Sequence, residues 1–185
     1  MNPKKCKSCG QKFTPQRPMQ QACSIPCAVD LANKAKAKAV KVRAQKERKE
    51  IKAKKESLKS RADWAREAQT AVNRYVRLRD AKNGCVSCDK PANWQGQWHA
   101  SHYRSVGAAG NLRFHLWNIH KACSVCNNHL SGNLAEYEPR LRAKIGDEKG
   151  DWLRGQNGPV KYSIDYLKRI KAVFTKKARR LEARL

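Results

Sequence analysis

Residues 85–133 decide the fold: CVSCDKPANWQGQWHASHYRSVGAAGNLRFHLWNIHKACSVCNNHLSGN. A Cys-x2-Cys pair stands near each end of this stretch, and two further close cysteine pairs precede it. Two thiolates two or three residues apart can bind one face of a tetrahedral Zn²⁺, and a second pair completes the site. Sequence proximity therefore predicts two structural zinc sites, about two zinc ions per chain, which use all the cysteines: Cys6, Cys9, Cys23 and Cys27 in one, and Cys85, Cys88, Cys123 and Cys126 in the other.

Disulfide bonds or scattered buried thiols are the alternative explanation of the cysteines. They fit poorly, because every cysteine falls into a close pair and none is left over. The first residues, MNPKKCKSCG, lack the apolar core of a signal peptide. We therefore expect a cytoplasmic protein, in a compartment that keeps thiols reduced and able to bind metal.

The chain is strongly cationic. Its 185 residues carry a net charge of +26 with a pI near 10.2, and such a chain repels itself unless a polyanion screens it. The mean hydropathy of −0.85 leaves little for a large core, and no apolar run reaches the roughly 18 residues that a membrane span needs. The composition therefore predicts a nucleic-acid partner and excludes a membrane protein.

Composition divides the chain into four segments. Residues 1–28 form a small N-terminal zinc knuckle, and residues 29–60 form a long basic helical arm. Between Lys34 and Arg61, 13 Lys and Arg residues outnumber three acidic ones and no continuous apolar stripe exists, so this helix is expected to be a solvated arm, a weak coiled coil or a phosphate-binding helix. Residues 61–150 form the main domain, and residues 151–185 contain a basic amphipathic helix.

Local patterns predict the elements of the main domain. Ser60 begins a capping box ahead of a helix with Trp64 and Val72 on its buried face. Alternating aromatic residues predict a strand over 97–104, residues 118–123 lead into the second cysteine pair, and Pro139 is expected to start a short helix. The predicted fold class is α+β, mainly helical, with a final helix capped by Ser163 that serves packing or dimer contact.

All the histidines lie within or just after the second cysteine loop: His99, His102, His115, His120 and His129. They either fill a small core or carry chemistry. The order Cys85-x2-Cys88, His102, Asn118, Cys123-x2-Cys126-Asn127 resembles that of HNH (ββα-metal) nucleases. More closely, WHASHYRS, RFHLWNIHKACSVCNNHLSGN, CVSC and the N-terminal CKSC and CSIPC resemble the NinG (Rap) family of lambdoid phages.

This resemblance implies an HNH catalytic domain with a structural zinc site and a recombination endonuclease that cuts branched DNA such as Holliday junctions or D-loops. Phosphodiester hydrolysis needs a base active near neutral pH, and the His102 imidazole is the candidate. The resemblance also assigns Asn127 as a ligand of a catalytic divalent ion and Asn118 as a residue that braces the loop and orients His102. An ordinary turn asparagine is the alternative for Asn118.

One position departs from the family pattern. Many HNH enzymes place Asp or His directly before the base, but here that residue is Ser101. Because strand side chains alternate, positions 99 and 101 share a face, so His99 is expected to reach the ion instead. His99 and Asn127 with waters and phosphate oxygens would form a weak Mg²⁺ or Mn²⁺ site. A packing role is the alternative for His99.

Several cations near this site are candidates for contacts with phosphate, although each of them can equally serve packing or solubility. They are His120, His129, Arg104, Lys121, Arg140 and Arg142, whereas His115 is expected to be structural. Symmetrical cutting of a four-way junction needs two active sites, so a homodimer is expected. The competing functions are an HNH nuclease that ignores branches and a non-catalytic, zinc-dependent nucleic-acid-binding protein.

Overall fold

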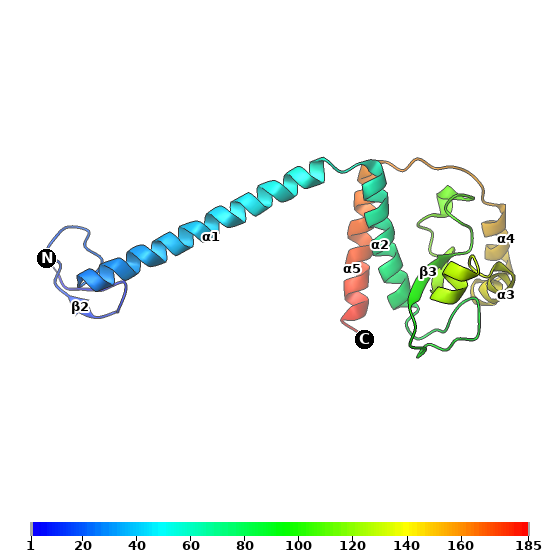
Figure 1. Cartoon of the computed structure of the whole chain (residues 1–185), viewed down its shortest axis with the longest axis horizontal. Coiled ribbons are helices and arrows are strands. Elements are labelled where there is room, and N and C mark those ends of the chain that lie inside the picture. The colour runs from blue at the N-terminus through cyan, green and yellow to red at the C-terminus, as the bar shows by residue number, and fades with distance from the viewer. Residues whose placement is uncertain (1, 185) are drawn as a thin grey trace. The chain divides into compact units, whose positions relative to one another are not determined.

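The structure is a computed structural model that describes residues 2–184, and the chain divides into two compact units between Leu58 and Lys59. The first unit combines the N-terminal knuckle with the long helix α1, Ile25–Ser57 (Figure 1). Its strands β1, Lys4–Lys5, and β2, Lys12–Phe13, form a short antiparallel hairpin. No residue of α1 is buried, as its missing apolar stripe predicts.

The second unit starts with two helices that pack along each other. Helix α2, Arg61–Arg79, begins at the predicted capping box, where the Asp63 amide donates to the Ser60 hydroxyl and the Ser60 amide donates to Asp63. Helix α5, Ile164–Glu182, begins at Ser163 and lies beside α2. Their shared core contains Trp64, Ala68, Val72, Val76, Leu167 and Phe174.

A two-stranded antiparallel sheet separates this helix pair from a second helical layer. Strand β3, Trp98–His102, pairs with β4, Ile119–Cys123, and Ile119 packs into the core of α2 and α5. Ala122 belongs to the other core, with residues of α3, Leu134–Ile145, and α4, Asp147–Gly155. The short helices η1, Gly110–Leu112, and η2, Val125–His129, flank β4 in the sequence.

Two helices differ from the sequence prediction. Helix α3 starts at Leu134 and contains Pro139, which was expected to be at its start. Asn133, in the left-handed conformation, ends the turn after η2 and lets the helix begin earlier. Helix α4 was not predicted, because Gly146 and Gly150 weaken the helical signal of that segment. No helix within residues 2–184 combines the length and apolarity needed to cross a bilayer.

Both cysteine clusters have the geometry of a zinc site. In each, the four sulfur atoms lie within 4.8 Å of one another. A tetrahedral site with Zn–S bonds of about 2.3 Å has sulfur–sulfur separations of about 3.8 Å. The observed separations are 3.6 Å for Cys9–Cys23, 3.7 Å for Cys23–Cys27 and 3.8 Å for Cys88–Cys123. These separations are far longer than a disulfide bond, so the clusters could hold zinc.

Backbone amides prepare the thiols for metal. In the first unit, the Cys9 amide is directed at the Cys6 sulfur and lowers the pKa of Cys6 to about 6, which favours the thiolate that binds zinc. In the second unit, the Cys85 sulfur accepts hydrogen bonds from the amides of Ser87 and Cys123. The second cluster thereby connects the loop after α2 to the end of β4.

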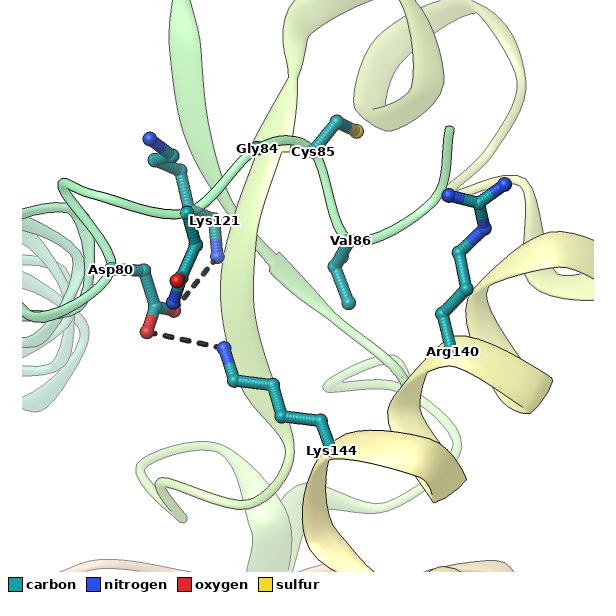
Figure 2. Close-up of a pocket in the computed structure, with 8 residues that line it drawn as sticks. Asp80, Gly84, Cys85, Val86, Lys121, Arg140 and Lys144 are labelled. Atoms are coloured by element: carbon teal, nitrogen blue, oxygen red, sulfur yellow. Dashed lines mark hydrogen bonds and ion pairs between the residues drawn. The ribbon is translucent and has the colours of Figure 1, made fainter. Parts of the chain in front are cut away.

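A buried carboxylate joins α2 to the sheet and to α3. Asp80, at the end of α2, is only 3% exposed and accepts hydrogen bonds from the Arg79 guanidinium, the Lys144 ammonium and the Lys121 amide. Figure 2 shows Lys144 directed toward Asp80 across a cavity of about 290 Å³, which Arg140 also lines. Burial by itself raises the pKa of Asp80, but Arg79 first, and then Lys144, hold it at about 2.

Zinc removal tests the two clusters separately. The purified chain is expected to contain about two zinc ions per molecule. The Cys88→Ser variant should retain about one and unfold its second unit at lower temperature, because metal binding supplies folding free energy there. The Cys9→Ser variant should also retain about one zinc but leave the melting of the second unit unchanged. Metal quantification and calorimetry measure both, and full zinc content in either variant contradicts the assigned ligands.

Replacement of Asp80 tests the buried network. The Asp80→Asn variant should lose about 3 kcal/mol of unfolding free energy at pH 7, because Arg79 and Lys144 then lack a counter-charge. The folded-state pKa is below the ordinary 3.8, so the carboxylate stabilises the fold above pH 4 and this stabilisation is lost as the pH falls toward 2. The difference between wild type and variant should therefore shrink by about 2 kcal/mol over that range.

Asp151→Asn is the matched control, because Asp151 also pairs with an arginine but is 70% exposed. Exposed pairs contribute about 1 kcal/mol or less, so this variant should be near neutral. Urea titrations at several pH values measure all three proteins. A pH-independent difference between wild type and Asp80→Asn would show that the Asp80 charge does not stabilise the fold.

Candidate active site

His102 lies at the end of β3 with one ring nitrogen fixed by the backbone. Its Nε2 is 3.0 Å from the carbonyl oxygen of Arg113. A carbonyl only accepts hydrogen bonds, so Nε2 carries the proton and Nδ1 keeps its lone pair. Burial lowers the pKa of His102 below its ordinary 6.5, against the opposing effect of the Arg113 carbonyl. The ring is therefore neutral at pH 7, with Nδ1 able to accept a proton.

Asn118 braces the loop that carries Arg113. Its side chain is fully buried, and its Oδ1 accepts from the Arg104 amide at 2.7 Å. Its Nδ2 donates to the carbonyl oxygens of Arg104 and Leu112, at 3.0 and 3.3 Å. These bonds connect Arg104 and Leu112, at the end of η1, to Asn118, which directly precedes β4. Asn118 thus acts on His102 through the backbone on both sides, because its backbone carbonyl oxygen also accepts from the Tyr103 amide at 2.9 Å.

His99 and Asn127 meet where η2 folds over β3. The Asn127 amide nitrogen donates to His99 Nδ1 at 3.2 Å and to Asn128 Oδ1 at 2.9 Å. One imidazole and one amide side chain provide two potential metal ligands. Hard cations prefer oxygen ligands, so an Mg²⁺ ion here would need the Asn127 amide oxygen and further oxygens from water and phosphate. The structure thus brings together the two residues that were expected to hold a divalent ion, and such an ion would still need oxygens from water and phosphate.

The structure separates His99 from His102. They are three residues apart on β3, where side chains alternate between the two faces. His99 pairs with Ala122, on the side of α3, whereas His102 pairs with Ile119, on the side of α2 and α5. The two imidazoles therefore leave opposite faces of the sheet. The single site expected from the sequence becomes two groups, His102 with Arg113 and His99 with Asn127.

His120 and Lys121 are part of the interior. His120 is 2% exposed, its Nε2 lies 3.0 Å from the Trp117 carbonyl oxygen, and its Nδ1 accepts from Arg79. Burial, with Lys144 and Arg79 nearby, lowers the pKa of His120 to about 4, so the ring is neutral. Lys121 is 4% exposed and donates to the Ala81 carbonyl oxygen. Both side chains have structural partners, which corrects their expected role as phosphate contacts.

The remaining candidates for phosphate contact divide by exposure. Arg104 donates to the Gln156 carbonyl oxygen, and Arg142 is bound by Glu138 and Asp151. Arg140 pairs with Asp89 at 2.9 Å at the mouth of the cavity in Figure 2. His129, at the end of η2, is exposed. Each of these arginines therefore has a protein partner, although Asp89 and Asp151 are themselves exposed, and His129 is the candidate that faces solvent without one among the described interactions.

Sequence reasoning missed two groups that organise the site. The Arg113 carbonyl fixes the His102 tautomer, and any residue type could supply that oxygen. Asp80 is the carboxylate on which Arg79, Lys144 and β4 converge. The signal available for it was an acidic residue alone in the basic segment RYVRLRDAKNG, directly before the second cysteine cluster.

Comparison with known proteins places the chain in a family. A family model described as "Bacteriophage Lambda NinG protein" matches residues 1–184. Protein ninG of Escherichia phage lambda is 41% identical over 131 aligned residues, which cover 71% of this chain and 63% of that protein, less than two thirds of its length. Protein ninG of Escherichia phage 933W is 36% identical over 189, covering 96% of this chain and 93% of that protein.

No solved structure matches the chain. Protein ninG of Salmonella phage P22 is 40% identical over 131 aligned residues, or 71% of this chain. The family model spans both cysteine clusters, α1 and the whole β3–β4 region, so the likeness extends over both compact units. The chain that carries these two clusters and the His102 loop therefore belongs to the NinG family of bacteriophage proteins.

Proposed function

We propose that this NinG-family chain is a metal-dependent endonuclease of the HNH type that hydrolyses phosphodiester bonds in branched DNA. The observation that carries the proposal is the state of His102. Its proton is held on Nε2 by the Arg113 carbonyl, and its lowered pKa leaves Nδ1 unprotonated at pH 7. A neutral imidazole with one fixed nitrogen is suited to take a proton from water.

The reaction proceeds by attack of water on the phosphorus atom. His102 Nδ1 takes the proton of the attacking water, the bond from phosphorus to the 3′ oxygen breaks, and the leaving oxygen takes a proton from solvent. A divalent ion held by Asn127 and His99 would supply Lewis-acid stabilisation of the charge on the phosphate. The pairing register puts His99 and His102 on opposite faces of β3, so the role proposed for His102 as the base does not depend on the ion ligands proposed here.

The charge of the chain supports a nucleic-acid substrate. A net charge of +26 favours a phosphate polymer and gives steep salt dependence to binding. The preference for branched intermediates such as Holliday junctions and D-loops comes from the family resemblance. Two active sites are needed to cut a four-way junction symmetrically, so the proposed active form is a homodimer.

A second candidate function is a non-catalytic, zinc-dependent nucleic-acid-binding protein. The observation in its favour is that no acidic side chain precedes His102: Ser101 is 2% exposed, and His99 lies on the other face. In that case His102 would only pack against Arg113. Cleavage assays with variants of His102 distinguish the two functions.

The His102→Gln variant is expected to cut a four-way junction about 100- to 10,000-fold more slowly than wild type, because the amide can still donate to Arg113 but cannot take a proton from water. Single-turnover cleavage of a labelled junction in Mg²⁺ measures the rate, and a linear duplex of matched sequence measures branch preference. Tyr166→Ala, which removes an exposed ring on another helix, should stay within about threefold of wild type. Equal rates for wild type and His102→Gln would favour the non-catalytic function.

The pH profile checks the same assignment. The neutral ring is the active form, and burial favours that form, so the wild-type rate should fall only when the pH drops through a value below 6.5. This acidic limb should be missing from the residual activity of His102→Gln. An acidic limb at or above 6.5, or one that persists in the variant, would assign the base to another group.

The ion site has a separate test. Asn127→Ala should raise the Mg²⁺ concentration for half-maximal cleavage by about tenfold or more, and His99→Ala should do the same if both bind the ion. Asn128→Ala is the matched control, since Asn128 is exposed and bonds only to Asn127 among the interactions described. An unchanged Mg²⁺ requirement in His99→Ala would remove His99 from the ion site and leave the role of His102 intact.

A further inference from the structure

Three aromatic rings gather on the surface of the second unit. His115 and Trp117 come from the loop between η1 and β4, and Trp152 comes from α4. Their centroids are 5.1 Å apart for His115–Trp117 and for His115–Trp152, and 5.7 Å apart for Trp117–Trp152. We call these three residues the aromatic platform.

The two tryptophans of the platform are exposed to solvent. Trp117 is 38% exposed and Trp152 is 43% exposed, whereas the other three tryptophans of the chain are buried or half-buried. Burying an aromatic ring is strongly favourable, so two large rings side by side at the surface need a reason. Packing of α4 against the loop explains their mutual contact, and both tryptophans still keep more than a third of their surface exposed.

A lysine borders the platform. Lys149 precedes Trp152 by three residues on α4, and its ammonium group lies 5.0 Å from the centre of the Trp117 ring. Burial lowers the pKa of His115, so its ring is neutral at pH 7. The surface thus offers uncharged aromatic rings, with one lysine ammonium group over the Trp117 ring. Aromatic rings that stack bases, next to cations that bind the backbone, are the elements of single-strand recognition.

The loop under the platform is held rigidly. Trp117 accepts a hydrogen bond through its carbonyl oxygen from His120 Nε2, and the Leu116 carbonyl oxygen accepts from Arg79. The same loop carries Arg113, whose carbonyl fixes His102, four residues before Trp117. A nucleotide on the platform would therefore be tied, through a short braced segment, to the residue proposed as the base.

We propose that the aromatic platform stacks unpaired nucleobases of DNA, with Lys149 contacting the adjoining phosphate. This inference rests on the proposed function and deepens it, because the displaced single strand of a D-loop presents unpaired bases that an intact duplex lacks. A protein partner is disfavoured by the net charge of +26, which selects a polyanion. Stacking also requires no particular sequence, since every base presents a flat π-face.

The test is a binding experiment without divalent ions, so that no cleavage occurs. The probes are a short fluorescent oligothymidylate and a duplex of equal length. The double variant Trp117→Ala and Trp152→Ala should bind oligothymidylate at least about fivefold more weakly, equivalent to about 1 kcal/mol, and bind the duplex within about twofold of wild type. Quenching of tryptophan fluorescence by oligothymidylate should fall in the same variant.

Two controls separate stacking from folding and from charge. The double variant Trp117→Phe and Trp152→Phe keeps aromatic faces and should restore oligothymidylate binding. Tyr166→Ala removes an exposed ring elsewhere in the unit, one that stacks on Tyr162 at 5.1 Å, and should leave binding unchanged. Lys149→Ala should weaken oligothymidylate binding more than duplex binding, because the phosphate it is proposed to contact adjoins the stacked base.

The outcomes also distinguish this inference from the proposed function. Equal loss of duplex and oligothymidylate binding in the alanine double variant, or no loss of either, would overturn the stacking role. Selective loss of oligothymidylate binding, with no cleavage of junctions by wild type in Mg²⁺, would retain the platform and overturn the nuclease.

Discussion

The arrangement of the second unit depends on four cysteine sulfurs that converge within 4.8 Å. A two-stranded sheet is marginally stable by itself, and here it also divides the unit into two small cores. Cys85 and Cys88 belong to the loop after α2, and Cys123 and Cys126 belong to β4 and η2. A metal bound by all four fixes η2 against β3, and this contact is what brings Asn127 to His99. The geometry around the candidate ion site therefore follows from the cluster.

The second constraint is the shortage of acidic residues. Only 15 Asp and Glu residues face 41 Lys and Arg residues, and several carboxylates are used to bind cations inside the fold. Asp80 holds Arg79 and Lys144 together, and Glu138 binds Arg142 and Arg154. These carboxylates pair with cations of the second unit, such as Arg79 and Lys144, whereas most lysines of α1 are exposed and can bind a polyanion. Arg140 and Arg142, near the candidate site, accordingly pair with carboxylates of the same unit.

Local patterns predicted much of the fold. The cysteine spacing predicted both clusters, the Ser60 capping box predicted α2, and the alternating residues of 97–104 predicted β3, whereas β4 was not predicted as a strand. The faces of the sheet were not predictable in the same way. The spacing of three residues puts the His99 and His102 side chains on opposite faces of β3. Which helices cover each face depends on packing between segments that are far apart in the sequence. In the sequence, His120 was likewise a candidate for phosphate contact. In the structure, Arg79, which is 41 residues away in the chain, donates a hydrogen bond to its ring.

The most consequential group in the site is a backbone carbonyl. Arg113 fixes the proton on His102, and its position depends on Asn118, whose three hydrogen bonds brace the loop from Arg104 to Leu112. His120 and Arg79 hold the far end of the same segment, beneath Trp117. The loop between η1 and β4 thus joins the proposed base to the aromatic platform through a few residues that are bonded at both ends. A substrate contact proposed at Trp117 and a proton transfer proposed at His102 would therefore lie on one short segment, which is hydrogen-bonded near both of its ends.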